Sequence, residues 1–206
     1  HPTCVEGGRS GADVAADKDK SMFDAVTIRN SGTRIWARTS LAMLAMAAAG
    51  QEIPTAAVDS LESSQSAEGS WDDGFGTLDN ADATAMAIMS LLAAGRAADD
   101  PAVVAAVDFL AGAQAAEGGW GYGAGLPASA NSTAVVVQAL LALGEDVTAT
   151  EGRWATAGGS PLDALLAFQG DSGAFRADFG DGPADDFYST VQAIPAAAGH
   201  TLPPQE

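Results

Sequence analysis

A repeated motif constrains the fold of this 206-residue chain more than any other feature of its sequence. Three segments share the pattern LxxxQxxxGx(W/F), with offsets of four, four and two residues: Leu61–Gln65–Gly69–Trp71, Leu110–Gln114–Gly118–Trp120 and Leu165–Gln169–Gly173–Phe175. A threonine and a later glycine form a second shared element, in the pairs Thr39…Gly50, Thr84…Gly95, Thr133…Gly144 and, more loosely, Thr190…Gly199. Such self-similarity is typical of folds in which each unit buries its apolar face against its neighbours.

Each unit predicts a helical hairpin. The segment from Pro101 to Gln114 places Val103, Val107 and Leu110 at helical spacing, with Pro101 in the first turn and Asp99 or Asp100 as the cap. The second segment, such as 133–143, is apolar around most of its circumference and must be covered on several sides. We therefore expect outer helices near 55–66, 101–115 and 160–169, and inner helices near 34–49, 82–94, 131–143 and 186–198.

The motif residues predict a structural staple at each hairpin joint. A glutamine at the end of an outer helix can bond exposed backbone groups, a glycine permits the chain to reverse, and an aromatic ring packs over the joint. The expected staple residues are Gln65, Gly69, Trp71, Gln114, Gly118, Trp120, Gln169, Gly173 and Phe175. The later glycines predict left-handed C-terminal caps at Gly50, Gly95, Gly144 and Gly199.

These LxxxQxxxGxW segments resemble the QW repeats of the terpene cyclase and prenyltransferase superfamily. That superfamily includes squalene-hopene cyclases, protein prenyltransferase β subunits and the cobalamin-carrier barrels of transcobalamin type. The likeness covers about residues 34–200 and is strongest between 55 and 144. It implies an all-α fold, an α/α toroid whose inner helices line a central cavity. With about four hairpins, fewer than complete toroids of this superfamily use, we expect a partial ring.

Composition divides the chain and limits its partners. We interpret residues 1–33 as an N-terminal arm or degenerate first helix, 34–200 as the repeat domain and 201–206 as the start of a linker or tail. The whole chain has 27 acids against nine bases, whereas residues 1–50 hold six bases and five acids. A net charge of −18 argues against nucleic-acid binding, which needs clustered lysine and arginine. No apolar run approaches the roughly 20 residues of a membrane span.

The resemblance also indicates where catalytic chemistry would lie. Cyclases that begin by protonation carry a DxDD-type motif, and the matching stretch keeps only Asp82, since Asn80 and Ala83 replace the other acids. A lone carboxyl at a helix N-terminus is stabilised as its anion, which favours a capping role for Asp82, as for Asn131 and Asp186. The repeats contain no cysteine or histidine, so they lack ligands for the zinc ion that protein prenyltransferases use. We therefore lean against an enzyme and expect no cofactor.

The links between helices supply the remaining candidates. Carboxylates there could hold calcium, but the EF-hand spacing is absent and we favour solvation and capping; they are Asp72, Asp73, Asp178, Asp181 and Asp185. Aromatic residues in or after the links could line the mouth of a pocket or serve in packing, and they are Trp120, Tyr122, Phe179 and Phe187.

Three functions follow from these observations. The first is a non-catalytic extracellular or cell-surface recognition or assembly module, bound to a protein partner or to further copies of itself. The alternatives are a carrier of a hydrophobic or corrinoid ligand, as the transcobalamin likeness implies, and a terpene-cyclase-type enzyme. A chain that starts at His1 rather than methionine suggests a processed protein or part of a longer one, which favours the extracellular location.

Overall fold

The structure, a computed structural model, describes residues 36–74, 79–123 and 125–203. Within these residues the fold is mostly helical, with seven helices: α2 (Trp36–Ala48), α3 (Thr55–Ser63), α4 (Ala81–Ala93), α5 (Pro101–Ala113), α6 (Ala130–Ala142), α7 (Pro161–Leu166) and α8 (Phe187–Ala197). Two short strands, β1 (Arg176–Ala177) and β2 (Ala184–Asp185), pair antiparallel. A helix occurs at each of the seven predicted positions, with bounds shifted by a few residues. The predicted arm, residues 1–33, lies outside the described residues.

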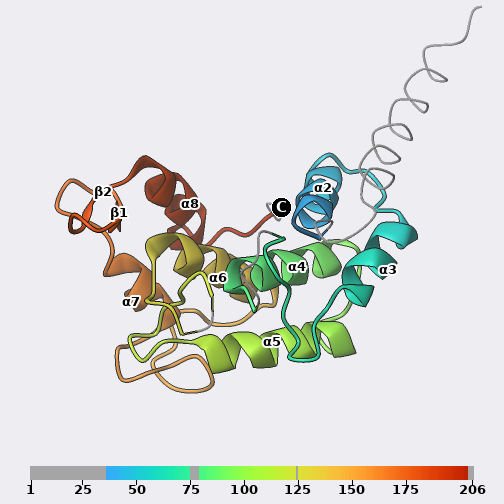
Figure 1. Cartoon of the computed structure of the whole chain (residues 1–206), viewed down its shortest axis with the longest axis horizontal. Coiled ribbons are helices and arrows are strands. Elements are labelled where there is room, and N and C mark those ends of the chain that lie inside the picture. The colour runs from blue at the N-terminus through green and yellow to red at the C-terminus, as the bar shows by residue number, and fades with distance from the viewer. Residues whose placement is uncertain (1–35, 75–78, 124, 204–206) are drawn as a thin grey trace, which may run out of the picture.

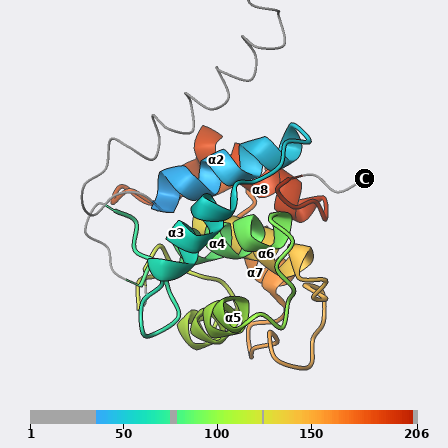
Figure 2. The same ribbon diagram turned by 90° about the vertical axis from the view of Figure 1, so that its right-hand side faces the viewer.

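The inner helices pack one after another. Helix α2 contacts α4, α4 contacts α6, and α6 contacts α8. Each of the first three also packs against the outer helix that follows it, in the pairs α2–α3, α4–α5 and α6–α7. Figure 1 shows the inner helices as an arc with α2 and α8 at its two ends and α3, α5 and α7 on its outer side, and Figure 2 shows the same arrangement after a quarter turn.

Small side chains let the inner helices approach closely and form the core. Helix α4 buries nine of its 13 residues and α6 also buries nine of 13, which matches their apolar character on nearly all sides. The contact between α2 and α4 includes a hydrogen bond, because the Ser90 hydroxyl donates to the Ser40 carbonyl at 3.1 Å. Among the described residues, no helix has the length and apolar character needed to cross a bilayer.

The N-terminal caps correct two predictions. Asn80 and Ser129, rather than Asp82 and Asn131, cap α4 and α6, and each accepts from the backbone N–H three residues on. The cap needs extended backbone just before the first helical residue, whereas Asp82 and Asn131 already lie inside the first turn. Asp186 caps α8 as predicted.

Other capping predictions are confirmed. Asp100 caps α5, with Pro101 at the start of the helix. Gly50, Gly95, Gly144 and Gly199 all have positive φ, between 64° and 87°, at the ends of the inner helices. After α4, for example, the Gly95 N–H bonds Leu92 and the next N–H bonds Leu91, which satisfies carbonyls that the helix leaves free.

Candidate functional site

The three hairpin joints repeat one set of hydrogen bonds. In each, the glutamine Nε2 donates at 2.9 Å to the carbonyl of the motif glycine, in the pairs Gln65–Gly69, Gln114–Gly118 and Gln169–Gly173. The backbone N–H of each aromatic residue donates to the threonine of the inner helix, in the pairs Trp71–Thr84, Trp120–Thr133 and Phe175–Thr190. The aromatic side chains are buried, with at most 2% exposed. The predicted glutamine bonds are present, and the shared threonine has a role that the sequence alone did not indicate.

The first two joints also contact the unit that follows them. Gln65 donates a second bond to the Ala102 carbonyl of α5, and Gln114 donates one to the Trp154 carbonyl. For Gln169 the structure has only the local bond, and its side chain is exposed. The motif therefore joins neighbouring units wherever a neighbour is present.

The space around the motif glycines also increases from the first joint to the last. A Cβ on Gly69 would collide with the Ala105 carbonyl group of α5, and one on Gly118 would lie 3.2 Å from the Thr156 hydroxyl. A Cβ on Gly173 would meet nothing within 4 Å in the described structure. All three glycines have φ near +85° to +90°, so the turn itself is alike in each unit.

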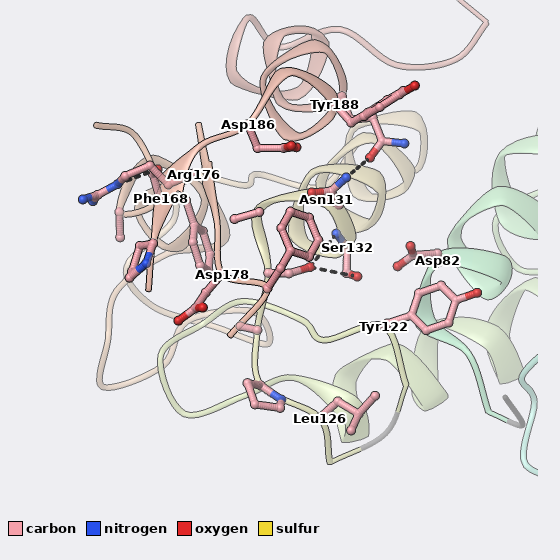
Figure 3. A pocket seen from close by; sticks show the side chains of 18 of the residues that line it. Asp82, Tyr122, Leu126, Asn131, Ser132, Phe168, Arg176, Asp178, Asp186 and Tyr188 are labelled. Atoms are coloured by element: carbon pink, nitrogen blue, oxygen red, sulfur yellow. Dashed lines mark hydrogen bonds between the residues drawn. The ribbon is translucent and has the colours of Figure 1, made fainter. Parts of the chain in front are cut away.

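A cavity of about 970 Å³ lies at the N-terminal ends of α4, α6 and α8. Its walls come from these helices, from the links before α6 and α8 and from the two residues that follow α7, so three repeat units contribute to it. Side chains on its walls include Asp82, Tyr122, Asn131, Phe168 and Tyr188 (Figure 3). This volume is in the range of small-molecule binding sites, which are roughly 300–1,000 Å³.

Three residues on the cavity walls occupy equivalent positions in the three repeat units. Asp82, Asn131 and Tyr188 each stand two residues before the threonine that binds the aromatic N–H. Because the inner helices are aligned side by side, the same first-turn position reaches the cavity in each unit. Alignment of the repeats on Thr84, Thr133 and Thr190 is the sequence signal that would have found Asn131 and Tyr188.

Among the acidic residues on the cavity walls, Asp82 is the one whose pKa is raised. Its carboxyl points toward the cavity (Figure 3), and one oxygen, Oδ1, is buried with no hydrogen-bond partner in the described part of the chain. Burial raises the pKa of Asp82 from 3.8 to about 6, and a hydrogen bond with Ser132 opposes that rise only in part. The sequence favours the ionised form of this carboxyl at a helix N-terminus, whereas burial raises its pKa and favours the protonated form.

Tyr122 forms the wall beside Asp82. Burial and a hydrogen bond to Asp73 raise the pKa of Tyr122 to about 12, so its hydroxyl stays protonated at neutral pH. That hydroxyl donates to Asp73 Oδ2 at 2.7 Å. The tyrosine therefore presents its ring to the cavity while its polar end is already bound.

The aromatic candidates divide between cavity and core. Tyr122 and Phe179 line the cavity, as the sequence suggested. Trp120 does not: it is fully buried, and its indole N–H donates to the Leu110 carbonyl at 2.8 Å. Phe187 is 74% exposed on α8 and does not line the cavity either. The next residue of the helix, Tyr188, lines the cavity instead. Phe168, which the motif pattern did not single out, also lines it.

The carboxylates proposed for calcium mostly bind their own loops. Asp72 accepts from the Gly74 N–H, Asp178 accepts from two glycine N–H groups, and Asp185 accepts from the Ser172 hydroxyl. The others of this set are Asp73, which binds Tyr122, and Asp181, which is exposed. No group of three or more histidine, cysteine or acidic side chains in the described ranges is placed to hold a metal ion. These bonds fit the capping interpretation.

The charge around the cavity is acidic. Its walls include three carboxylates, Asp82, Asp178 and Asp186, and one guanidinium, Arg176. Figure 3 shows Arg176 directed away from the side where Asp82 and Tyr122 lie, and its Nε is 3.5 Å from the Phe168 carbonyl. Side-chain caps already occupy N–H groups at the three helix ends, which reduces their attraction for an anion. The cavity therefore favours a positively charged ligand.

No protein-family model matches the chain, and no curated protein matches it. Its function is inferred from the cavity and the hairpin joints.

Proposed function

We propose that the chain is a non-catalytic binding module whose cavity binds an organic ammonium ion with an apolar body. The observation that carries this proposal is the half-buried Asp82 carboxyl, which points toward a cavity with aromatic residues on its walls and has one oxygen, Oδ1, without a partner among the described residues. Above pH 6 this carboxyl is mainly ionised in spite of its burial. An ammonium group in the cavity would pair with the negative charge of this carboxylate.

The rest of the cavity suits the apolar body of such a ligand. The rings of Tyr122, Phe168 and Phe179 contribute to its walls. Aromatic faces attract organic cations by roughly 0.5–2 kcal/mol each, and a carboxylate nearby adds a directional contact. The volume of about 970 Å³ is sufficient for a small organic cation, since small-molecule sites have roughly 300–1,000 Å³.

We further propose that the hairpins are related in architecture to the superfamily with QW repeats, as a partial α/α toroid. The support is the common geometry of the joints at Trp71, Trp120 and Phe175 and the consecutive packing of the inner helices. A cavity at one end of the inner helices is also consistent with the carrier hypothesis, with a cationic organic ligand in place of a corrinoid.

A pair of probes of matched size tests the cavity. Calorimetric titration at pH 7.5 with phenethylamine, which is protonated at that pH, is compared with 2-phenylethanol, which is neutral. We expect the amine to bind at least about tenfold more tightly, or about 1.4 kcal/mol. Equal affinities would contradict the proposal, because the Asp82 carboxylate would then contribute nothing.

Two variants locate the effect. Asp82→Asn should abolish the preference for the amine, whereas Asp181→Asn, at an exposed carboxylate outside the cavity walls, should retain it. The affinity of the unaltered chain for the amine should also fall as the pH is lowered through 6, because Asp82 is protonated there. A preference that survives in Asp82→Asn would place the ligand elsewhere.

The raised pKa of Asp82 also favours a second candidate, an acid-initiated reaction of terpene-cyclase type. Asn80 and Ala83 still replace the other acids of the motif, and Asn80 is committed to capping α4. We therefore expect no products from squalene or geranylgeranyl diphosphate by mass spectrometry. Products that disappear in Asp82→Asn would replace the binding proposal with catalysis.

A further inference from the structure

The exposed face of α8 carries a stripe of apolar side chains. Phe187, Val191 and Ile194 follow one another at helical spacing and are 74%, 49% and 56% exposed. No charged residue occurs between Phe187 and Ala198, in a chain whose net charge is −18. Exposed apolar residues grouped in this way are a feature of surfaces that bind another surface.

The repeat shows what packs on this face in the other units. Counted from the shared threonine, Phe187, Val191 and Ile194 correspond to Ala81, Ala85 and Ile88 in α4 and to Ala130, Ala134 and Val137 in α6. All six of these counterparts are buried. The three positions are therefore exposed in α8 and buried in α4 and α6.

Hydrogen bonds show which side of α4 and of α8 packs against the preceding inner helix. Gln192 and Ser189 of α8 bind Asn131 of α6, and Ser90 of α4 binds the Ser40 carbonyl of α2. The opposite side of each inner helix therefore receives the next inner helix. For α8 no such helix follows among the described residues.

The other end of the arc presents the complementary face. Leu41 of α2 is 56% exposed, and Ala45 and Ala48 on the same side are exposed as well. Ala45 corresponds to Ser90, Ala139 and Ala196, which are all buried against the preceding inner helix. No charge occurs from Leu41 to Ala49. Helix α2 thus offers a face of mostly small side chains to the large ones of α8.

We infer that the α8 face binds the α2 face of a second copy of this chain. The contact continues the existing series α2–α4–α6–α8 with an inner helix of the same kind, and Figure 1 shows the two faces at the two ends of the arc. In the proposed dimer the contact is made twice, so that each copy contributes one α8 face and one α2 face. This inference is independent of the cavity and its ligand.

Solution mass is the first test. Light scattering on the full chain in 0.3 M NaCl should give twice the monomer mass of 20.5 kDa. The dimer fraction should fall at 20 mM NaCl, because two chains of charge −18 repel each other when salt does not screen them. A monomer at every salt concentration would overturn the inference.

Substitutions at the two faces give a sharper test. Ile194→Asp and Leu41→Asp should each weaken dimerisation at least tenfold, whereas Val104→Asp, at a 43% exposed apolar residue of α5, should not. Circular dichroism should show each variant folded, since all three positions are exposed. Unchanged mass in Ile194→Asp would contradict the inference.

Mixing the variants distinguishes head-to-tail from symmetric contact. A mixture of Ile194→Asp and Leu41→Asp chains retains one intact α8 face and one intact α2 face, so it should form mixed dimers more strongly than either variant alone. If α8 instead bound α8, the Leu41→Asp chain would remain dimeric by itself, which would overturn the assignment. A folded chain that stays monomeric because residues 1–35 cover α8 would overturn it too.

Discussion

The joint at Trp120 and the joint at Phe175 carry the same motif in different surroundings. Around Trp120 the glutamine bonds two carbonyls, the indole N–H has an acceptor and the motif glycine is buried. Around Phe175 the glutamine bonds only the local glycine carbonyl, and both residues are exposed. The comparison separates two functions of the motif, reversal of the chain within a unit and attachment of the next unit.

The difference also explains why both the cavity and the open face lie where they do. Residues near the last joint, such as Phe168, face the cavity, because no further unit packs over them in the described structure. Helix α8 has a covered side toward α6 and an apolar side toward solvent. The last unit therefore contributes both to the cavity and to an exposed apolar face.

Truncation of the joint aromatic residues should give the largest contrast. We expect Trp120→Ala to lower the free energy of unfolding by about 3–5 kcal/mol, because it removes a fully buried ring and an indole hydrogen bond. Phe175→Ala should cost less, about 2–3 kcal/mol, since one side of its joint is open and it has no indole N–H. Urea unfolding followed by circular dichroism measures both.

Phe179→Ala is the control, because this ring is 87% exposed and its removal should cost under about 0.5 kcal/mol. Equal losses for Trp120→Ala and Phe175→Ala would show that the contacts with a following unit do not stabilise the joint.

Asp82→Asn gives α4 the side chain that α6 has at the same position of the repeat, Asn131. A carboxyl whose pKa is raised by folding, here from 3.8 to about 6, stabilises the fold below pH 3.8 and loses that contribution as the pH rises through 6. The variant should therefore be more stable than the unaltered chain by about 2–3 kcal/mol at pH 8, with the difference vanishing toward pH 4.

Unfolding of both chains across this pH range measures the difference directly, and the titration of other carboxylates cancels in it. Asp181→Asn, at an exposed position, should show a flat difference. A flat profile for Asp82→Asn as well would mean that burial does not raise the pKa of this carboxyl.

The glutamines should give the smallest contrast. Gln114→Ala removes bonds to Gly118 and Trp154 and should cost about 1–2 kcal/mol. Gln169→Ala removes one exposed bond and should cost about 0.5 kcal/mol or less. The same urea experiment measures both, and a larger loss for Gln169 than for Gln114 would reverse the interpretation of the motif.

The sequence by itself determined the helices and their joints. The features that specify them act over a few residues and can be recognised in the sequence: apolar periodicity, Pro101, the capping residue Asp100 and the C-terminal glycines. The bond from Gln114 to Gly118 spans four residues and was predictable for the same reason. Caps were the weak point, because Asn80 and Asp82 both have suitable side chains and only the backbone conformation distinguishes them.

Only the tertiary structure decided the properties of the site. Asp82, Asn131 and Tyr188 meet at one cavity because three helices from distant segments lie side by side. The raised pKa of Asp82 and the exposure of Phe187 likewise depend on which segments cover them. Periodicity and turns are properties of neighbouring residues along the chain, whereas desolvation depends on everything that surrounds a group, which no local pattern records.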